Sequence, residues 1–112
     1  MTRARPLAAL LVAAAIAWAA PGAAEDMPVF RIVMKDGTIT PARLAVPGNR
    51  PFKLEITNAG RTPAEFESLA LHKERVLVAG ASSSLVFRRV EPGEYEFFDD
   101  FHPEARAVLV AK

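Results

Sequence analysis

Short stretches in which apolar and polar side chains alternate recur along most of this chain. The clearest is residues 52–57, where Phe52, Leu54 and Ile56 alternate with polar neighbours. A strand points successive side chains to opposite faces, so this period of two predicts a strand with one buried face. Similar runs predict further strands at residues 29–34, 64–69, 75–78, 84–90, 94–98 and 105–111.

Turn-forming residues separate these runs. They include Lys-Asp-Gly at residues 35–37, Asn-Ala-Gly at 58–60 and Glu-Pro-Gly at 91–93. Beyond residue 24 no stretch repeats its apolar positions with the period of an amphipathic helix. About seven short strands, with turns at roughly ten-residue intervals, predict an all-β fold of the β-sandwich type.

The first 24 residues follow a different pattern. Arg3 and Arg5 precede 14 apolar residues at positions 7–20, and Pro-Gly-Ala-Ala follows. A charged start, a short apolar run and a small-residue site are typical of a secretory signal peptide, and the run is shorter than the roughly 20 residues that span a bilayer. We expect a signal peptide at residues 1–24, cut after Ala24 or else after Ala20, and an exported domain at residues 25–112. An uncleaved N-terminal anchor is the alternative; in a Gram-negative bacterium either one places the domain in the periplasm.

Composition removes several classes of function. The chain has no cysteine, which excludes disulfides, thiolate metal sites, cysteine nucleophiles, blue-copper centres and a covalent lipid anchor. Two of the 14 basic residues lie in the predicted signal peptide, so 12 bases face 13 acids in the remainder. Without a basic surplus, nucleic-acid binding has little support. Phosphate-loop, GxSxG and HExxH motifs are missing from the sequence.

Two acidic clusters are candidates for chemistry. Glu65 and Glu67 lie two positions apart on a predicted strand, so both point to one face while Phe66 points to the other. Two like charges repel unless water, a proton or a cation relieves them. A solvated strand face is the simpler interpretation of this pair, and a metal site is the sharper one.

The second cluster lies among aromatic residues at positions 95–104, in the predicted loop between the last two strands. It contains Asp99, Asp100, His102 and Glu104. Carboxylates with one imidazole suit iron, Cu(II), Mn(II) or zinc. The alternative is an acidic loop in which His102 only hydrogen-bonds the backbone.

Other positions carry weaker signals. His72 lies in a charged turn and is expected at the surface. Met34 ends a predicted strand and is expected to pack in the core or at an edge, with a soft axial metal ligand as the alternative. Arg88 and Arg89 form either an outward-facing strand end or a patch that binds a partner.

The order of these motifs resembles the cupredoxin pattern. Asn-Ala-Gly at 58–60, Pro-Ala-Glu at 63–65, Pro-Gly-Glu-Tyr-Glu-Phe-Phe-Asp at 92–99 and then His102 carry the resemblance. It implies a cupredoxin-like Greek-key β-sandwich from about residue 29 to residue 112. It also implies that Glu65 and His102 stand at the positions of the two histidine ligands and Asp99 at that of the cysteine. The axial methionine position falls near Ala107. A blue-copper electron carrier is thereby excluded.

Glu-Phe-Glu at 65–67 and Phe-Phe-Asp-Asp-Phe-His-Pro at 97–103 resemble a more specific cupredoxin-like branch. This branch includes a small periplasmic component of an oxidase-dependent ferrous-iron transport system and the N-terminal domain of imelysin-type iron-uptake proteins. The resemblance implies an iron or copper ion held by Glu65, Glu67, Asp99 and His102. Asp100 is the alternative to Asp99 or a further ligand, and Glu104 is a nearby acid.

The same resemblance implies partners and a role. The partners are a membrane iron permease and other periplasmic iron-uptake components. The role is to assist ferrous-iron oxidation or delivery to the permease, which leaves a ferroxidase activity open. The rival hypothesis is a metal-free β-sandwich subunit whose acidic end docks on a membrane transporter.

Overall fold

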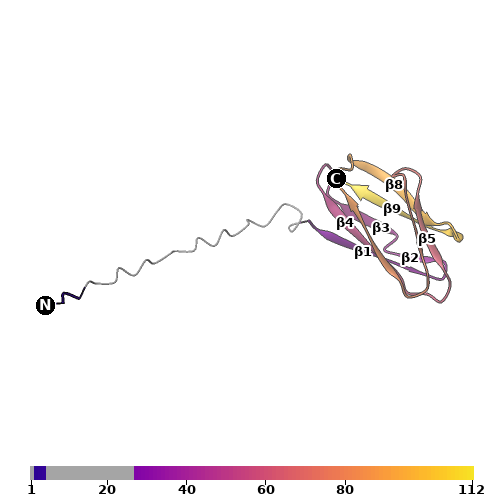
Figure 1. Ribbon diagram of the computed structural model, residues 1–112. Helices are drawn as coiled ribbons and strands as arrows, with labels where there is room; N and C mark the ends of the chain where they lie inside the picture. The colour runs from indigo at the N-terminus through magenta and orange to yellow at the C-terminus, as the bar shows by residue number, and fades with distance from the viewer. Residues whose placement is uncertain (1, 5–26) are drawn as a thin grey trace.

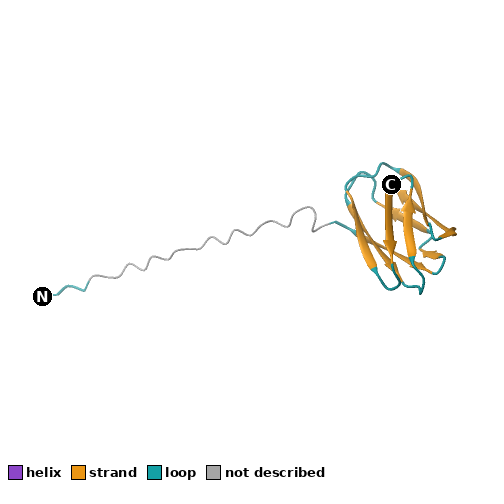
Figure 2. Ribbon diagram, turned by 45° about the vertical axis from the view of Figure 1, so that its right-hand side comes forward, coloured by secondary structure: helices purple, strands orange, loops and turns teal. Residues whose placement is uncertain are grey.

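A computed structural model describes residues 2–4 and 27–112, and residues 29–111 form two β-sheets packed face to face (Figures 1 and 2). The predicted all-β sandwich is confirmed. In the described part of the chain no helix is long and apolar enough to cross a membrane. Apart from residues 2–4, the predicted signal peptide lies outside the described residues.

The first sheet contains four strands in the order β2-β1-β4-β7. Their bounds are β1 Val29–Lys35, β2 Thr38–Thr40, β4 Phe52–Asn58 and β7 Ser82–Phe87. β1 runs parallel to β4, whereas the other two pairs are antiparallel. Along β4 the predicted alternation is confirmed, because Phe52, Leu54 and Ile56 are fully buried.

The second sheet contains five strands in the order β3-β9-β8-β5-β6. Their bounds are β3 Arg43–Val46, β5 Ala64–Ser68, β6 Lys73–Leu77, β8 Gly93–Asp99 and β9 His102–Ala111. β3 is parallel to β9, and the remaining pairs are antiparallel. β5, which carries the Glu-Phe-Glu motif, therefore lies between β8 and β6.

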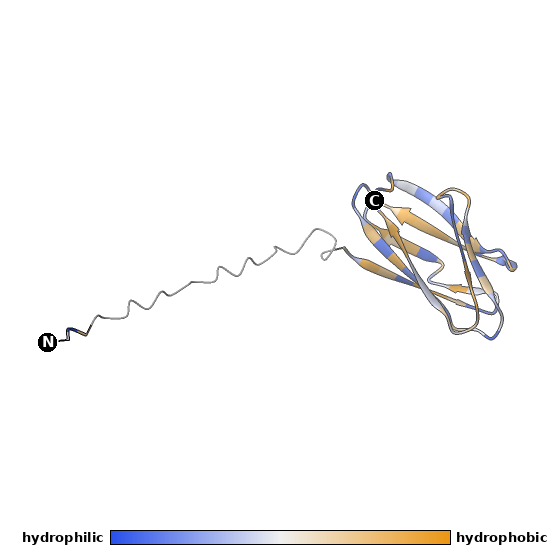
Figure 3. Cartoon of the chain, viewed as in Figure 1, coloured by the Kyte–Doolittle hydropathy of each residue, from blue (hydrophilic) through white to orange (hydrophobic). Residues whose placement is uncertain are grey.

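The core lies between the two sheets and is rich in aromatic rings. Phe52 stacks on Phe87 with ring centroids 5.0 Å apart, and Phe66 meets Phe97 at 5.2 Å. Met34 is fully buried in the same core, as the sequence predicts. Figure 3 shows the hydrophobic colour concentrated in the strands, while several connecting loops are hydrophilic.

Two features differ from the sequence-based prediction. The described residues form nine strands rather than about seven, because β2 and β3 are only three and four residues long and carry too little pattern to detect. The last strand begins at His102 rather than near residue 105. The predicted loop between the last two strands is therefore wrong in length: it is a tight turn at Asp100 and Phe101.

The carboxylate of Asp36, in the β1–β2 turn, is hydrogen-bonded to the segment that leads into β5. Asp36 Oδ1 accepts hydrogen bonds from the backbone N–H of Arg61 (2.9 Å), the backbone N–H of Thr62 (3.0 Å) and the Thr62 hydroxyl (2.8 Å). These bonds, the Thr62 hydroxyl first, hold the pKa of Asp36 below its ordinary value. A Cβ at Gly60 would lie 2.5 Å from the same oxygen, so this close approach requires glycine.

Candidate metal site

Glu65 and Glu67 lie on the outer face of β5. Ala64, Phe66 and Ser68 between and beside them are buried, whereas the two glutamates are half-buried. This confirms the prediction that both glutamates share one face and that Phe66 occupies the other.

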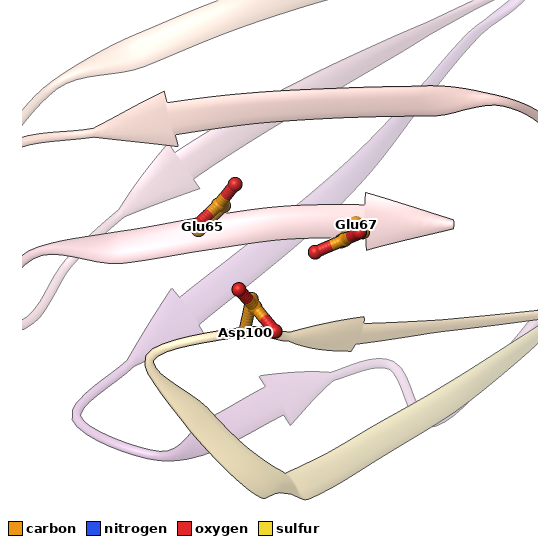
Figure 4. A group of neighbouring side chains, drawn as sticks. All are labelled: Glu65, Glu67 and Asp100. Carbon is orange, nitrogen blue, oxygen red and sulfur yellow. The ribbon is translucent and has the colours of Figure 1, made fainter. Parts of the chain in front are cut away.

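Asp100 joins the two glutamates from the neighbouring strand. The pairing of β8 with β9 shifts register between Phe98 and Asp99, and Asp100 is the first residue after β8. Its backbone N–H donates to the Glu65 carbonyl at 2.9 Å. One carboxylate oxygen from each of Glu65, Glu67 and Asp100 lies within 4.8 Å of the other two (Figure 4). We call this group the acidic cluster.

The acidic cluster concentrates like charge in a partly desolvated place. Burial raises the pKa of Glu65, and the negative charges of Asp100 and Glu67 raise it further. Burial likewise raises the pKa of Glu67, and the negative charges of Asp100 and Glu74 raise it further. Because each ionised carboxylate opposes the others, a proton or a bound cation stabilises the arrangement.

Glu74 is a contributor that the sequence pattern did not reveal. It faces Glu67 across the β5–β6 ladder. In the sequence it stands between Lys73 and Arg75 and so looks like part of a neutralised charged turn. Only strand pairing places it beside Glu67, and pairing partners are not encoded in local spacing.

Asp99 occupies a different environment from Asp100. Its side chain is fully buried. Oδ1 accepts hydrogen bonds from the backbone N–H groups of Glu65 and Phe101, both at 3.0 Å, and Oδ2 lies 2.9 Å from His102 Nδ1. The structure thus pairs Asp99 with His102 and leaves both outside the acidic cluster. The five residues that the sequence proposes as ligands divide into a group of three and a group of two.

The remaining candidates are dispersed. Glu104 and the ring of His102 lie against the β1–β2 turn, where a Cβ on Gly37 would meet them at 3.3 Å and 3.5 Å. His72 is exposed in the turn after β5, as the sequence predicts. His102 and the half-exposed Phe101 line an open groove of about 550 Å³, which we call the apolar groove; its other lining residues are Thr62, Pro63, Val76 and Val78.

Comparison with known proteins identifies the family. The sequence model of the family described as "Cupredoxin-like domain" matches residues 7–111. The chain belongs to the cupredoxin-like domain family. This cupredoxin-like protein is also 36% identical over 80 residues to an uncharacterized protein of Rickettsia prowazekii (strain Madrid E), covering 71% of this chain and 64% of that one. It thus spans less than two thirds of that relative's length.

Solved structures confirm the cupredoxin-like fold. Reduced auracyanin from Roseiflexus castenholzii has a TM-score of 0.66 at 12% identity and covers 77% of this chain and 97% of its own. The purple cupredoxin of Nitrosopumilus maritimus gives 0.55 at 18%, with 73% and 98% covered. The metal-binding domain of the Cu(I)-exporting ATPase CopA of Streptococcus pneumoniae, solved with Cu(I), gives 0.63 at 15%, with 75% and 84% covered. At these identities the likeness concerns the fold.

The donors of this cupredoxin-like protein do not fit a copper–thiolate centre. The chain has no cysteine, and a buried aspartate with three hydrogen-bond partners follows Phe98 at the end of β8. Soft thiolate and thioether donors select Cu(I), whereas carboxylate oxygens suit harder ions. The acidic cluster offers carboxylate oxygens alone, so it fits an oxygen-seeking cation with water in the remaining positions.

Proposed function

We propose that this cupredoxin-like protein binds an oxygen-seeking metal ion through Glu65, Glu67 and Asp100. The observation that carries the proposal is the meeting of three carboxylate oxygens within 4.8 Å. The raised pKa of both glutamates agrees with it. A cation bound between the three carboxylates would offset their mutual repulsion, because it places a positive charge close to each of them.

Iron is the first candidate for the ion. Hard anionic oxygens favour an ion of high charge, so the acidic cluster favours Fe(III) over Fe(II). The resemblance of Glu-Phe-Glu to the iron-uptake branch supports the same choice. Copper is the second candidate, because the solved CopA domain holds Cu(I) in a similar fold. In this chain the oxygen donors would accept Cu(II) rather than Cu(I).

Handling of the ion for transport is the role that suits the cluster best. Asp100 is exposed and the glutamates are half-exposed, so an ion bound there stays open to exchange with another protein. Together with the predicted signal peptide, this supports a periplasmic protein that holds iron, including the ferric product of iron oxidation, for a membrane iron permease.

The test is a titration of the purified protein with Fe(III), Cu(II), Mn(II) and Zn(II), each supplied with a weak competing chelator. We expect one-to-one binding that weakens at least tenfold in each of Glu65→Gln, Glu67→Gln and Asp100→Asn. Glu94→Gln is the matched control, since Glu94 lies near the start of β8 in an ion pair with Arg43. Its affinity should stay within twofold of wild type. Absence of binding tighter than about 1 mM, or an equal loss in the control, would contradict the proposal.

One observation favours the second candidate, a metal-free subunit that docks on a membrane transporter. The apolar groove presents Phe101, Val76 and Val78 at the surface, and Glu65 pairs with Val76 across the ladder, so acid and apolar surface adjoin. Under this hypothesis Phe101→Ser reduces complex formation while metal content is negligible throughout. Under the metal hypothesis Phe101→Ser leaves the metal affinity unchanged.

A further inference from the structure

Basic residues gather in a groove between the end of β7, the start of β6 and the first residues of β8. Lys73, Arg88 and Arg89 line an open cavity of about 520 Å³. The lining also includes Phe87 and Tyr95. We call this the basic groove. It shares no residue with the acidic cluster, so it concerns a separate property of the protein.

The fold explains why these cations converge. β7 and β6 are edge strands of different sheets. β7 ends at Phe87, and the chain bends at Arg88 and leaves the sheet. Two consecutive residues on a strand would point to opposite faces, but past the end of β7 both Arg88 and Arg89 line one groove. Lys73, the first residue of β6, lines it from the other sheet.

The positive charge of the groove is not neutralised from within. Glu91 is the acid among its lining residues, against three cations. In the part of the chain that the structure describes, the ion pairs formed by lysine or arginine involve Arg31, Arg43 and Arg106 and include none of the three cations of the groove. A concave site with unbalanced positive charge attracts an anion.

One aromatic ring, that of Tyr95, gives the groove an apolar side. Phe87 is buried and stacked on Phe52, and the Lys73 ammonium lies 5.9 Å from the centroid of the Phe87 ring. Tyr95 is half-buried, and its hydroxyl donates a 2.7 Å hydrogen bond to the Glu91 carbonyl, which fixes the ring. The groove therefore combines charged donors with one half-buried aromatic ring, and its volume lies in the range of small-molecule sites.

We propose that the basic groove binds a small anion in which a phosphate or carboxylate group is joined to a flat apolar body. Arginine presents planar donors that match the oxygens of both groups. The anionic group would contact Arg88, Arg89 and Lys73, and the apolar body would lie against Tyr95. This assigns the paired arginines to ligand binding rather than to a solvated strand end.

Tyr95 permits a direct test because it is the chain's only tyrosine. Its ring resonances are followed by NMR during titration with phenyl phosphate and with benzoate, which separate the phosphate from the carboxylate source. Inorganic phosphate tests the charge alone, and phenol tests the ring alone. We expect saturable shifts with at least one of the two aromatic anions, at least fivefold weaker binding of inorganic phosphate, and no saturable shift with phenol.

The variant Arg88→Gln/Arg89→Gln should weaken binding of the aromatic anion at least tenfold. Arg31→Gln, a charge change at an exposed position on β1, is the control and should leave binding within twofold of wild type. Backbone amide shifts elsewhere in the double variant verify that it folds. Three results would overturn the proposal: no saturable shift up to about 10 mM of either anion, equal weakening in Arg31→Gln, or shifts that follow protein concentration without added ligand and so report self-association.

Discussion

Asp99 and Asp100 are neighbours in the sequence, yet their carboxylates lie in opposite environments. Asp99 is fully buried and has three hydrogen-bond partners. Asp100 is exposed and shares its surroundings with two glutamates whose pKa values are raised. The register shift between Phe98 and Asp99 precedes this divergence. A carboxylate surrounded by donors stabilises the fold, whereas one surrounded by acids is suited to hold a cation.

The largest difference should appear in stability. Asp99→Ala leaves the backbone N–H groups of Glu65 and Phe101 without their acceptor in a partly buried place, which costs about 1–3 kcal/mol. Asp100→Ala should change the free energy of unfolding by less than about 0.5 kcal/mol, as is usual for a surface position. Urea unfolding of both variants measures the difference. Equal losses would show that the two aspartates do not differ as described.

Metal affinity should depend on the acidic cluster and not on the pair of Asp99 with His102. Glu65→Gln weakens binding at least tenfold, because it removes one of the three charged donors of the acidic cluster. His102→Gln, which keeps a polar partner for Asp99, should change affinity less than threefold. Competition with a chelator of known affinity measures both. A loss in His102→Gln as large as that in Glu65→Gln would instead favour the ligand set that the cupredoxin resemblance implies.

Most strands could be predicted from the sequence because alternation is a local signal. β4 shows this best, since the alternation of Phe52, Leu54 and Ile56 with polar residues identifies the buried face within seven residues. β2 and β3 could not be predicted. These two strands lie on either side of Pro41 and contain only three and four residues, which is too short for a recognisable alternation.

The part of the candidate site that lies on one strand could be predicted, again because the signal is local. The shared face of Glu65 and Glu67 follows from their spacing. The separation of Asp99 from Asp100 does not, because it arises where β8 loses register with β9. The position of Glu74 depends on the pairing of β5 with β6, which is equally non-local.

A smaller effect should appear in the pH dependence of the metal-free protein. The pKa of Glu65 and of Glu67 is raised above the ordinary value of 4.5. Each therefore contributes stability that is complete below that value and is lost as pH rises through the higher pKa of the folded state. Glu65→Gln/Glu67→Gln should flatten this part of the stability curve. Metal affinity should weaken as pH falls through the same range, because protons compete with the ion. A stability curve identical to wild type would contradict the raised pKa values.

The smallest expected effect belongs to Asp36, whose pKa is lowered by its bonds to Thr62 and Arg61. Here the sign is opposite: the stabilisation is present above the ordinary value of 3.8 and is lost as pH falls through the lower pKa of the folded state. Asp36→Asn should reduce the acid sensitivity of unfolding without changing the slope near the glutamate range. Acid titration followed by circular dichroism measures it, with Glu94→Gln as a control of equal charge change. If Asp36→Asn and the wild type unfold over the same acidic pH range, these hydrogen bonds do not favour the ionised carboxylate.

The ligands of the bound ion provide the most direct test of the acidic cluster as a metal site. X-ray absorption of the protein loaded with one equivalent of Fe(III) distinguishes oxygen donors from imidazole, whose ring gives a characteristic multiple-scattering pattern. The cluster of Glu65, Glu67 and Asp100 predicts a first shell of oxygen atoms alone, unchanged in His102→Gln. An imidazole signal in the wild-type protein that disappears in His102→Gln would contradict it.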